Sequence, residues 1–479
     1  MTKEKQAAIA AVEEKAAVIA DVADSVWGYA ELSLQEERSA AKYCQVLARE
    51  GFTVEKGICG ISTAFSASFG SGRPVIGILA EYDALSGLSQ KAGSLTREEL
   101  IPGGCGHGCG HNLLGAGALA AALGVKAYLE RTACPGTVVL YGCPGEEGGA
   151  AKAFMAREKL WYGLDAALTW HPKDVNEVVT GSSNSCIQTQ YKFTGVAAHA
   201  AGDPDRGRSA LDAVELMNIG VQFLREHTTD DCRIHYAIID SGGVSPNVVQ
   251  AHATVLYMVR ANKVADSVKL QERVDKIAQG AALMTDTRFD RVFIDGTAEL
   301  LPNYTIEKLL QQNMELIGAP EYDGDDLAFA QALRSTYDAE TDPPGIGAKY
   351  DEQIALQVRE LTENMQKPLN DFVMPLYSGN VFIPGSTDVG DVSWLTPTSQ
   401  VDIVTWPAGM PHHSWQAVSC GKSGFAHKGL LMAAKVLAAT AIDLMEKPEA
   451  LQAAREEFAR RAASGYVCPI EPGEEPKAI

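Results

Sequence analysis

The sequence predicts an α/β protein with a doubly wound mixed sheet, into which a ferredoxin-like domain is inserted. Three observations support this fold class. Apolar runs bounded by glycine and proline alternate with helical patterns up to residue 184, as in sheets that carry helices on both faces. From residue 185 the predicted order becomes β-α-β-β-α-β, which is the ferredoxin-like order. The length of 479 residues also exceeds what one core usually supports.

We therefore expect a discontinuous first domain over residues 1–184 and 299–479, and an inserted domain over residues 185–298. The inserted domain would present open strand edges and two amphipathic helices, which favour dimerisation. Closure of this domain over the first one, as a lid, is a further expectation.

The first domain is expected to begin with two helices and to continue as alternating strands and helices. Its apolar runs are short and lie between glycines and prolines, which is typical of strands buried on both faces. The predicted elements are helices over 1–24 and 27–51, strands over 62–70 and 74–85, a helix over 111–132, a strand over 136–143, a helix over 152–164 and a strand over 165–172.

The inserted domain and the C-terminal part are predicted in the same way. The elements are strands over 186–195, 232–240, 253–261 and 291–299, with helices over 203–227, 265–286, 305–318 and 427–447. The stretch 320–376 contains two helical patterns around a Pro-Pro-Gly break, and pattern alone gives it no place in the fold. The last dozen residues are expected to form a loose tail.

Composition excludes some classes of partner. The chain has 41 Lys and Arg against 61 Asp and Glu, a formal net charge of -20, so its average potential repels nucleic-acid phosphates and anionic lipids. We therefore expect neither nucleic acid nor a membrane as a partner. The sequence contains no run of about 18 apolar residues, so no transmembrane span is predicted. Without the features of a signal peptide, the chain is expected to be cytoplasmic, with its ten scattered cysteines reduced.

The densest group of chemical side chains is GGCGHGCGHN, which places Cys105, His107, Cys109 and His111 within seven positions. Thiolate and imidazole donors in a glycine-rich turn suit a transition metal, because glycine lets the backbone fold tightly around the ion. A loop with incidental Cys and His is the alternative.

Three more groups follow predicted strands, at the sheet edge where open α/β sheets bind ligands. Glu146 and Glu147 follow VVLYGCPG, although a helix N-terminus would also favour two carboxylates. His171 closes the strand in DAALTWHP, where a packed histidine is the alternative. His412 and His413 follow VDIVTW, and we expect at least one of them to face the site.

With these motifs in this order, the chain resembles the dinuclear metallopeptidase and amidohydrolase superfamily, which includes aminoacylases, folate-type glutamate carboxypeptidases and indole-acetyl-amino acid hydrolases. The resemblance extends over nearly the whole chain and is specific as a set. Its segments are WGYAELSLQEE, LAEYDAL, HGCGHNLLGAG, PGEEGG, TWHP, GVAAHAA, SPNVV, GSTDVGDVSW, HHSWQ and GKSGFAHKG. It implies an amide-bond hydrolase that uses two divalent metal ions, Zn or Mn.

The resemblance also implies residue roles. Cys109 takes the place of the bridging ligand, where most of the superfamily has an aspartate. Glu146 corresponds to the general base that takes a proton from the attacking water, and Asp83 to a carboxylate that orients a ligand. The implied metal ligands are Cys109, His111, Glu147, His171 and His413.

Residues of the inserted domain are further candidates. His199 in GVAAHAA resembles a histidine that reaches across a dimer to stabilise the oxyanion, and a capping or core position is the alternative. Asn247 and Arg260 are candidates to hold a substrate carboxylate, because the planar guanidinium of arginine pairs bidentately. Arg206 and Arg208 compete with Arg260 for that role, and surface positions would suit all three arginines.

The sequence departs from the superfamily pattern in two respects. Many indole-acetyl-type relatives continue the Cys-Gly-His motif with Asp and a second His, whereas Asn112 and Leu113 follow here. The motif is also duplicated, so Cys105 and His107 remain an alternative pair. Cys109 and His111 are favoured because they directly precede the small-residue helix, as in the family.

The expected reaction is metal-dependent hydrolysis of the amide bond of an N-acyl or N-aroyl amino acid. The first candidate substrate is p-aminobenzoyl-glutamate, which would give p-aminobenzoate and glutamate. A second hypothesis is a dipeptidase, or an amidohydrolase of another N-acyl amino acid, with the same site. A third is a metal-binding subunit that needs a homologous partner chain. We expect a homodimer, or a heteromer with a homologous subunit.

Overall fold

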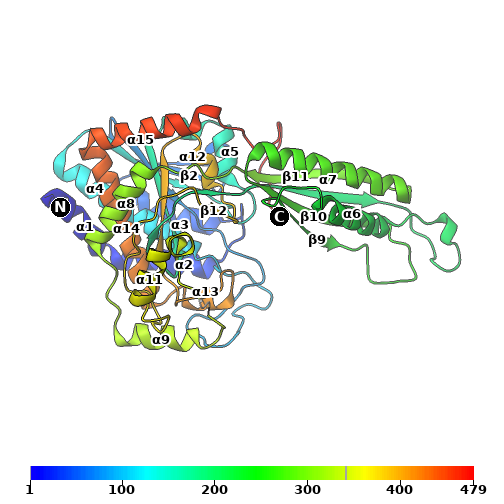
Figure 1. The fold of residues 1–479 in the computed structure, drawn as a ribbon, viewed down its shortest axis with the longest axis horizontal. Helices are drawn as coiled ribbons and strands as arrows, with labels where there is room; N and C mark the ends of the chain where they lie inside the picture. Colours follow the sequence, from blue (N-terminus) through cyan, green and yellow to red (C-terminus); the bar gives the residue numbers. More distant parts are fainter. Residues whose placement is uncertain (1, 340–341, 479) are drawn as a thin grey trace.

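The computed structural model describes residues 2–339 and 342–478. A main domain carries a seven-stranded sheet, and an inserted domain with a four-stranded sheet projects from it as an arm (Figure 1). The predicted fold class, a mixed α/β sheet with a ferredoxin-like insertion, is confirmed. The first strand of the inserted domain begins at Ser185, and its last strand ends at Thr297.

The main sheet is mixed, and its central strands are parallel. In sheet order its strands are β1 (Thr53–Lys56), β2 (Phe65–Ser71), β4 (Gly136–Gly142), β3 (Val75–Ala80), β5 (Ala166–Lys173), β13 (Thr398–Val404) and β6 (Glu177–Val178). β3 is parallel to β4 and β5, and β5 is parallel to β13. The carboxyl ends of these four strands therefore share one sheet edge, where ligands bind in open α/β folds.

The central strands are apolar on both faces because helices cover both. Successive side chains of a strand point to opposite faces, so in β4 Val138 and Leu140 enter one core cluster while Val139 and Tyr141 enter another. The first cluster includes α4 (His111–Thr132), α8 (Tyr304–Ile317) and α14 (Gly424–Glu446), and the second includes α5 (Ala151–Arg157) and α12 (Val389–Ser393).

Helix α4 is the core helix of the main domain. Among the described residues, it is the one helix that is long and apolar enough to cross a membrane. However, 89% of its apolar stretch is buried inside the fold. Its small residues allow close packing on the sheet, since a Cβ at Gly117 would lie 2.7 Å from Nε1 of Trp170 in β5. The helix begins at His111, so this side chain lies at the start of a buried helix.

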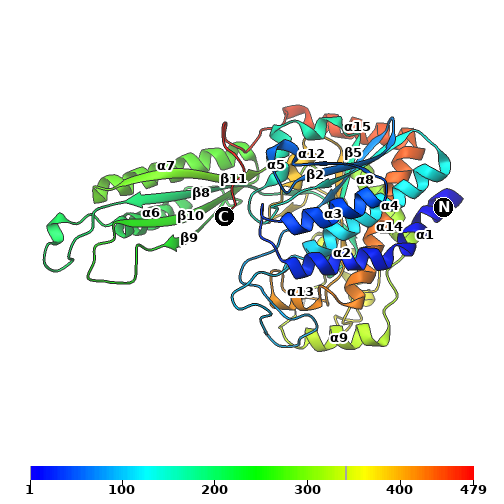
Figure 2. The same ribbon diagram turned by 180° about the vertical axis from the view of Figure 1, so that it is seen from behind.

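Three helices replace the two that were predicted at the N-terminus, and they lie on the side seen in Figure 2. Residues 31–36, predicted as helix, form a loop because their polar side chains bind elsewhere. Ser33 Oγ donates to Asp83, and the Glu36 carboxylate accepts the N–H of Gly145, both at 2.8 Å. The three helices are α1 (Lys3–Glu14), α2 (Ala16–Tyr29) and α3 (Glu37–Arg49).

The inserted domain has the predicted β-α-β-β-α-β order. Its sheet is antiparallel throughout, in the order β11-β8-β10-β9, and the two helices pack with the sheet around one apolar core. β9 is an edge strand. The elements are β8 (Ser185–Thr194), α6 (Ala210–Arg225), β9 (Arg233–Asp240), β10 (His252–Ala261), α7 (Val264–Thr285) and β11 (Arg288–Thr297).

The stretch that pattern alone could not place belongs to the main domain. It contains α9 (Gly324–Arg334), α10 (Ile346–Tyr350) and α11 (Glu352–Leu361). Beyond it, β12 (Phe382–Ile383) pairs in parallel with β7 (Ser182–Ser183). This pairing brings residues 382–388 beside the strand that leads into the inserted domain. Two more helices, α13 (Trp415–Cys420) and α15 (Pro448–Arg461), complete the main domain.

The last dozen residues were predicted to form a loose tail, and this is wrong for the described ones. The Arg291 guanidinium in β11 donates to both carboxylate oxygens of Glu471, at 2.7 and 2.9 Å. Lys477 Nζ donates to the carbonyl oxygen of Phe293 at 2.9 Å. The segment after α15, which we call the C-terminal strap (residues 465–478), therefore links the main domain to the inserted domain. The sequence did not predict these contacts, because they join charged residues to partners that are far away along the chain.

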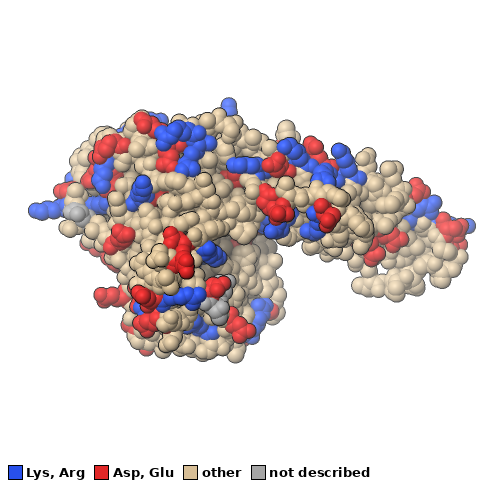
Figure 3. Space-filling view, viewed as in Figure 1, with Lys and Arg blue, Asp and Glu red and all other residues tan. Residues whose placement is uncertain are grey.

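Charged side chains are distributed over both domains. On the face shown in Figure 3, Lys and Arg lie interspersed with Asp and Glu on the main domain and on the arm. On this face, charges of both signs are therefore mixed, although the net charge of the chain is -20.

We expect Asp391, which anchors the C-terminal strap, to make stability depend on pH. Its carboxylate accepts hydrogen bonds from Tyr466 Oη at 2.6 Å and from the N–H of Ala298 at 3.0 Å, and burial raises its pKa to about 8. Because this folded-state pKa lies above the unfolded value of about 4, the stabilising proton is fully bound at low pH and is lost as the pH rises through about 8.

The variant Asp391→Asn tests this expectation. The wild-type free energy of unfolding should fall between about pH 5 and pH 8, and the substitution should reduce the fall by up to about 1.4 kcal/mol per pH unit. Urea midpoints at several pH values measure the difference. An equally steep fall in the variant would contradict the assignment.

Candidate functional site

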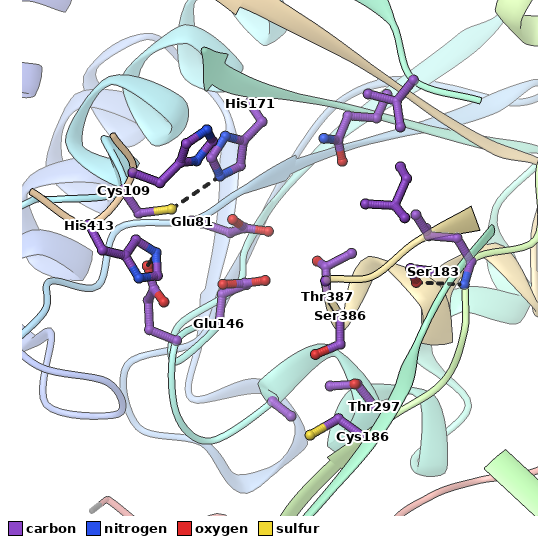
Figure 4. Close-up of a pocket in the computed structure, with 18 of the residues that line it drawn as sticks. Glu81, Cys109, Glu146, His171, Ser183, Cys186, Thr297, Ser386, Thr387 and His413 are labelled. Atoms are coloured by element: carbon purple, nitrogen blue, oxygen red, sulfur yellow. Dashed lines mark hydrogen bonds and ion pairs between the residues drawn. The ribbon is translucent and has the colours of Figure 1, made fainter. Parts of the chain in front are cut away.

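A cavity of about 570 Å³ lies where the main domain meets the inserted domain. Figure 4 shows Cys109, His171, His413 and Glu146 gathered on one side of it, with Ser386 on the other. Cys109 precedes α4, His171 lies near the carboxyl end of β5, and Glu146 and His413 follow β4 and β13. These positions share one edge of the sheet, as the topology predicts. The volume suits a small-molecule ligand.

Cys109 lies at the centre of two groups of potential metal ligands. Its Sγ and the ring nitrogens of His111 and His171 all lie within 4.8 Å of one another, and Sγ forms a second such group with Glu147 and His413. Sγ is 3.3 Å from His171 Nε2, and Glu147 Oε1 is 3.4 Å from His413 Nε2. One sulfur is thus common to two sets of three donors, and the five residues predicted as ligands lie together.

The ring of His111 is oriented by Asp83. His111 Nδ1 lies 2.8 Å from Asp83 Oδ1, and Oδ2 of the same carboxylate accepts from Ser33 Oγ at 2.8 Å and from the Glu147 N–H at 2.9 Å. Burial alone would raise the pKa of Asp83, but the His111 ring and these hydrogen bonds lower it to about 2. With Nδ1 engaged, His111 Nε2 faces the Cys109 group and has no hydrogen-bond partner among the described residues.

The other two imidazoles are also held. His171 Nδ1 lies 2.7 Å from the carbonyl oxygen of Pro172, which leaves Nε2 toward Cys109. Burial lowers the pKa of His171 well below its usual value, so this ring is neutral and its Nε2 lone pair is available. His413 has a φ of 50°, in the left-handed region that side chains other than glycine rarely adopt. The nearby Glu147 carboxylate, 3.4 Å from His413 Nε2, raises the pKa of His413.

Glu146 lies beside these donors. Its carboxylate forms a third group with His111 and Glu81, again within 4.8 Å. Burial and then the nearby Glu81 raise the pKa of Glu146 well above its usual range. Glu81 was not among the predicted site residues. The available signal was LAEYDAL, in which Glu81 and Asp83 lie two positions apart directly after β3.

The duplicated motif is resolved by the fold. His107 Nε2 lies 3.0 Å from the carbonyl oxygen of Val26 in the protein interior. Neither Cys105 nor His107 belongs to a ligand group in the described part of the chain. The candidate ligand groups of the described chain therefore contain Cys109 and His111, the pair that directly precedes α4.

The two adjacent histidines also have different surroundings. The His412 ring packs edge-on against Trp406, with centroids 5.0 Å apart, and its Nε2 lies 3.4 Å from Lys173 Nζ. His412 lines the cavity but belongs to none of the ligand groups found in the described chain. His413 is the histidine that faces Glu147.

The candidates for substrate binding are separated. Arg260 lines the cavity from β10, and its guanidinium donates to Ser386 Oγ at 2.7 Å. His199 and Asn247 are exposed in loops of the inserted domain and do not line this cavity. They adjoin each other, because the N–H of Ala200 donates to the carbonyl oxygen of Asn247 at 3.0 Å. Within one chain, the site therefore receives Arg260 but neither His199 nor Asn247.

The competing arginines lie outside the cavity. Arg208 Nε is 2.8 Å from Asp286, and the Arg206 side chain is 78% exposed. Neither lines the cavity, so among the three arginines considered Arg260 has the position expected of a substrate-binding residue.

The chain is similar in sequence and in fold to several known proteins. Residues 185–284 match the model of the peptidase dimerisation domain. Over 94% of its length, the chain is 45% identical to a p-aminobenzoyl-glutamate hydrolase subunit of Escherichia coli (strain K12), of which it covers 94%. The chain belongs to the M20 family of peptidases. As a member of this family it is a hydrolase of amide bonds.

Two further similarities place this M20 chain among its relatives. It is 28% identical to a second, different subunit of p-aminobenzoyl-glutamate hydrolase from the same Escherichia coli strain, over 53% of this chain and 59% of that one. A dinuclear metal-binding M20 peptidase from Bacillus subtilis superimposes with a TM-score of 0.52 at 17% identity, over 91% of this chain and 99% of that one. The match to the Bacillus protein shows that the fold is shared.

Substitution of Cys109 should affect both donor groups at once. We expect Cys109→Ala to lower the affinity of this M20 chain for Zn²⁺ or Mn²⁺ by at least about 10-fold, because the common atom is lost. Cys105→Ala is the matched control and should leave the affinity unchanged. Elemental analysis after equilibrium dialysis measures the bound metal. Equal metal contents in the two variants would refute the assignment.

Proposed function

We propose that the chain is a two-metal amidohydrolase that cleaves the amide bond of an N-acyl or N-aroyl amino acid, with p-aminobenzoyl-glutamate as the first substrate to test. The observation that carries the proposal is the position of the Cys109 sulfur in two donor groups, with Glu146 beside them and Arg260 in the same cavity. The 45% identity to a subunit of a protein named p-aminobenzoyl-glutamate hydrolase supports this substrate class.

The donor set fits two divalent cations. His111 Nε2 and Glu147 Oε1 are buried, and each has only a long polar contact of 3.4 Å, to Glu81 Oε2 and to His413 Nε2 respectively. A bound cation would satisfy both buried atoms better. The residues that would hold the ions are Cys109, His111, His171, Glu147 and His413. Thiolate and imidazole favour Zn, and the carboxylates also suit Mn. When bound, the ions would polarise the scissile carbonyl and lower the pKa of water.

Glu146 is proposed as the general base. Its carboxylate accepts a proton from the attacking water while a C–O bond forms at the scissile carbonyl. It then delivers that proton to the amide nitrogen as the C–N bond breaks, so that an acid and an amine leave. Burial and the nearby Glu81 raise the pKa of this carboxyl, and a less acidic carboxyl is the better proton acceptor from the attacking water.

Arg260 is proposed to bind the carboxylate of the substrate. The Arg260 side chain is half-buried, and its guanidinium donates to Ser386 Oγ and to Met258 Sδ. No carboxylate lies within 4.0 Å of its guanidinium in the described chain. Because no carboxylate of the described chain pairs with it, this guanidinium can form two parallel hydrogen bonds to the carboxylate of a substrate.

We further propose that His199 and Asn247 serve the site of a partner subunit, since their own chain leaves them exposed. The inserted domain has an apolar edge formed by α6 and the edge strand β9, where Ile219 is 56%, Phe223 72% and Ile238 44% exposed. Apolar side chains on an unpaired strand edge favour association of two copies. A homodimer is the simplest partner, and a heteromer with a homologous subunit is the alternative. We expect the cytoplasm as its location, because it keeps the Cys109 thiol reduced.

The substrate proposal is tested with the purified single chain, loaded with Zn²⁺ or with Mn²⁺. We expect release of p-aminobenzoate from p-aminobenzoyl-glutamate, loss of activity after chelation and its return with either metal. A panel of dipeptides and aliphatic N-acyl amino acids is assayed in parallel. Faster hydrolysis of dipeptides would favour the dipeptidase hypothesis, and activity that requires an added homologous chain would favour the heteromer.

The general base is tested by Glu146→Gln, which keeps the shape of the side chain. We expect kcat to fall by at least about 100-fold, while the two metal equivalents measured by elemental analysis are retained. A variant that keeps its rate would disprove the assignment.

The dimer is tested by Phe223→Glu on α6. A charge at this apolar edge should shift the chain to a monomer in light scattering, with a loss of activity because the partner no longer supplies His199. Tyr162→Glu, at a position 62% exposed in the main domain, is the control and should remain a dimer. A dimer that persists in Phe223→Glu would place the interface elsewhere.

A further inference from the structure

A buried lysine lies directly behind the candidate site. Lys152 in α5 has no solvent exposure, and its Nζ lies 2.7 Å from Glu81 Oε1 and 2.5 Å from Asp388 Oδ1. The other Asp388 oxygen accepts the backbone N–H of Lys152 at 3.0 Å. Neither Lys152 nor Asp388 lines the cavity, so this ammonium does not touch a bound substrate.

Stability alone is a weak reason for such an arrangement. Removal of an ammonium and two carboxylates from water costs several kcal/mol for each ion, and apolar side chains of similar volume are often as stabilising. The residues beside Lys152 in α5 are apolar, since Ala151, Ala153 and Phe154 belong to one core cluster. The contacts of its two carboxylate partners, Glu81 and Asp388, indicate a role for the Lys152 ammonium.

The first partner connects Lys152 to the donor groups. Glu81 Oε1 is held by the ammonium, while Glu81 Oε2 lies 3.4 Å from His111 Nε2. A ligand atom of Glu81 also lies within 4.8 Å of both His111 and Glu146. Because one oxygen is fixed, the carboxylate cannot rotate freely, and the other oxygen stays directed at His111 and Glu146.

The second partner connects Lys152 to the opposite side of the cavity. Asp388 is preceded by Ser386 and Thr387, which line the cavity, and Ser386 Oγ accepts the hydrogen bond from Arg260. The same ammonium thus holds the side chain beside the donor groups and the backbone segment that supports Arg260.

We propose that Lys152 is a positioning residue that fixes the donor groups and Glu146 relative to the carboxylate-binding Arg260. The proposal rests on the proposed function for its account of Arg260. Glu81 transmits the effect to the reaction centre, and Asp388 transmits it to the segment 385–388. Small displacements of either would lower the rate because the reacting groups depend on near-contact geometry.

The main test compares Lys152→Met and Lys152→Arg with a matched control, all loaded with Co²⁺. The control is Lys5→Met, because Lys5 is also a buried lysine, with Nζ 2.7 Å from Asp443 in the main domain, and lies outside the cavity lining. Visible absorption of bound Co²⁺ reports ligand geometry without any substrate. We expect Lys152→Met to bind two equivalents with an altered spectrum, and Lys5→Met to keep the wild-type spectrum.

Kinetic constants give the second readout. We expect Lys152→Met to lower kcat/KM by about 10-fold to 100-fold, with partial recovery in Lys152→Arg, which keeps a cation. A wild-type spectrum and wild-type kinetics in Lys152→Met would overturn the proposal, and so would equal effects in Lys5→Met.

A further variant addresses the case in which Lys152→Met does not fold. Asp388→Asn keeps the pair between Lys152 and Glu81 but weakens the link to the segment 385–388. We expect KM for p-aminobenzoyl-glutamate to rise about 10-fold with a smaller change in kcat, and unchanged KM would overturn the proposal. If the wild type hydrolyses nothing in the panel, the substrate proposal fails, while the Co²⁺ spectra still decide the role of Lys152.

Discussion

The carboxylate of Asp83 holds together the parts of the chain that form the site. It binds the ring of His111 at the start of α4, the hydroxyl of Ser33 in the loop before α3, and the backbone of Glu147 after β4. These three segments are far apart in the sequence, and the carboxylate itself lies just after β3. Because His111 stabilises the ionised form of Asp83, one buried charge orders the positions from which the donor side chains project.

The sequence predicted the fold best where local burial alone determines the type of residue. The small-residue run of α4 and the apolar runs of β4 and β5 specified the central layers, because burial on both faces demands them. The ligand roles of Cys109, Glu147 and His171 came from the family resemblance, and the predicted elements only placed these residues near one sheet edge. The duplicated Cys-Gly-His unit needed the fold, since only packing turns His107 into the interior.

Other features have no local signature. Residues 31–36 continue the helical periodicity, yet Ser33 and Glu36 find better partners across the domain. Glu81 and Lys152 read as ordinary polar residues, and their pairing appears only when β3 and α5 come together. His199 and Asn247 lie exposed in loops of the inserted domain, and spacing along the chain does not encode this exposure.

The C-terminal strap has a mechanical consequence. Two chain connections, near residues 185 and 298, join the inserted domain to the main domain. Two such connections define a hinge axis about which the inserted domain could rotate. The strap adds an attachment beside that axis, through Arg291 with Glu471 and Lys477 with Phe293. Any swing of the arm must either carry the strap with it or break these contacts, so the resting angle between the domains is set partly by the last residues of the chain.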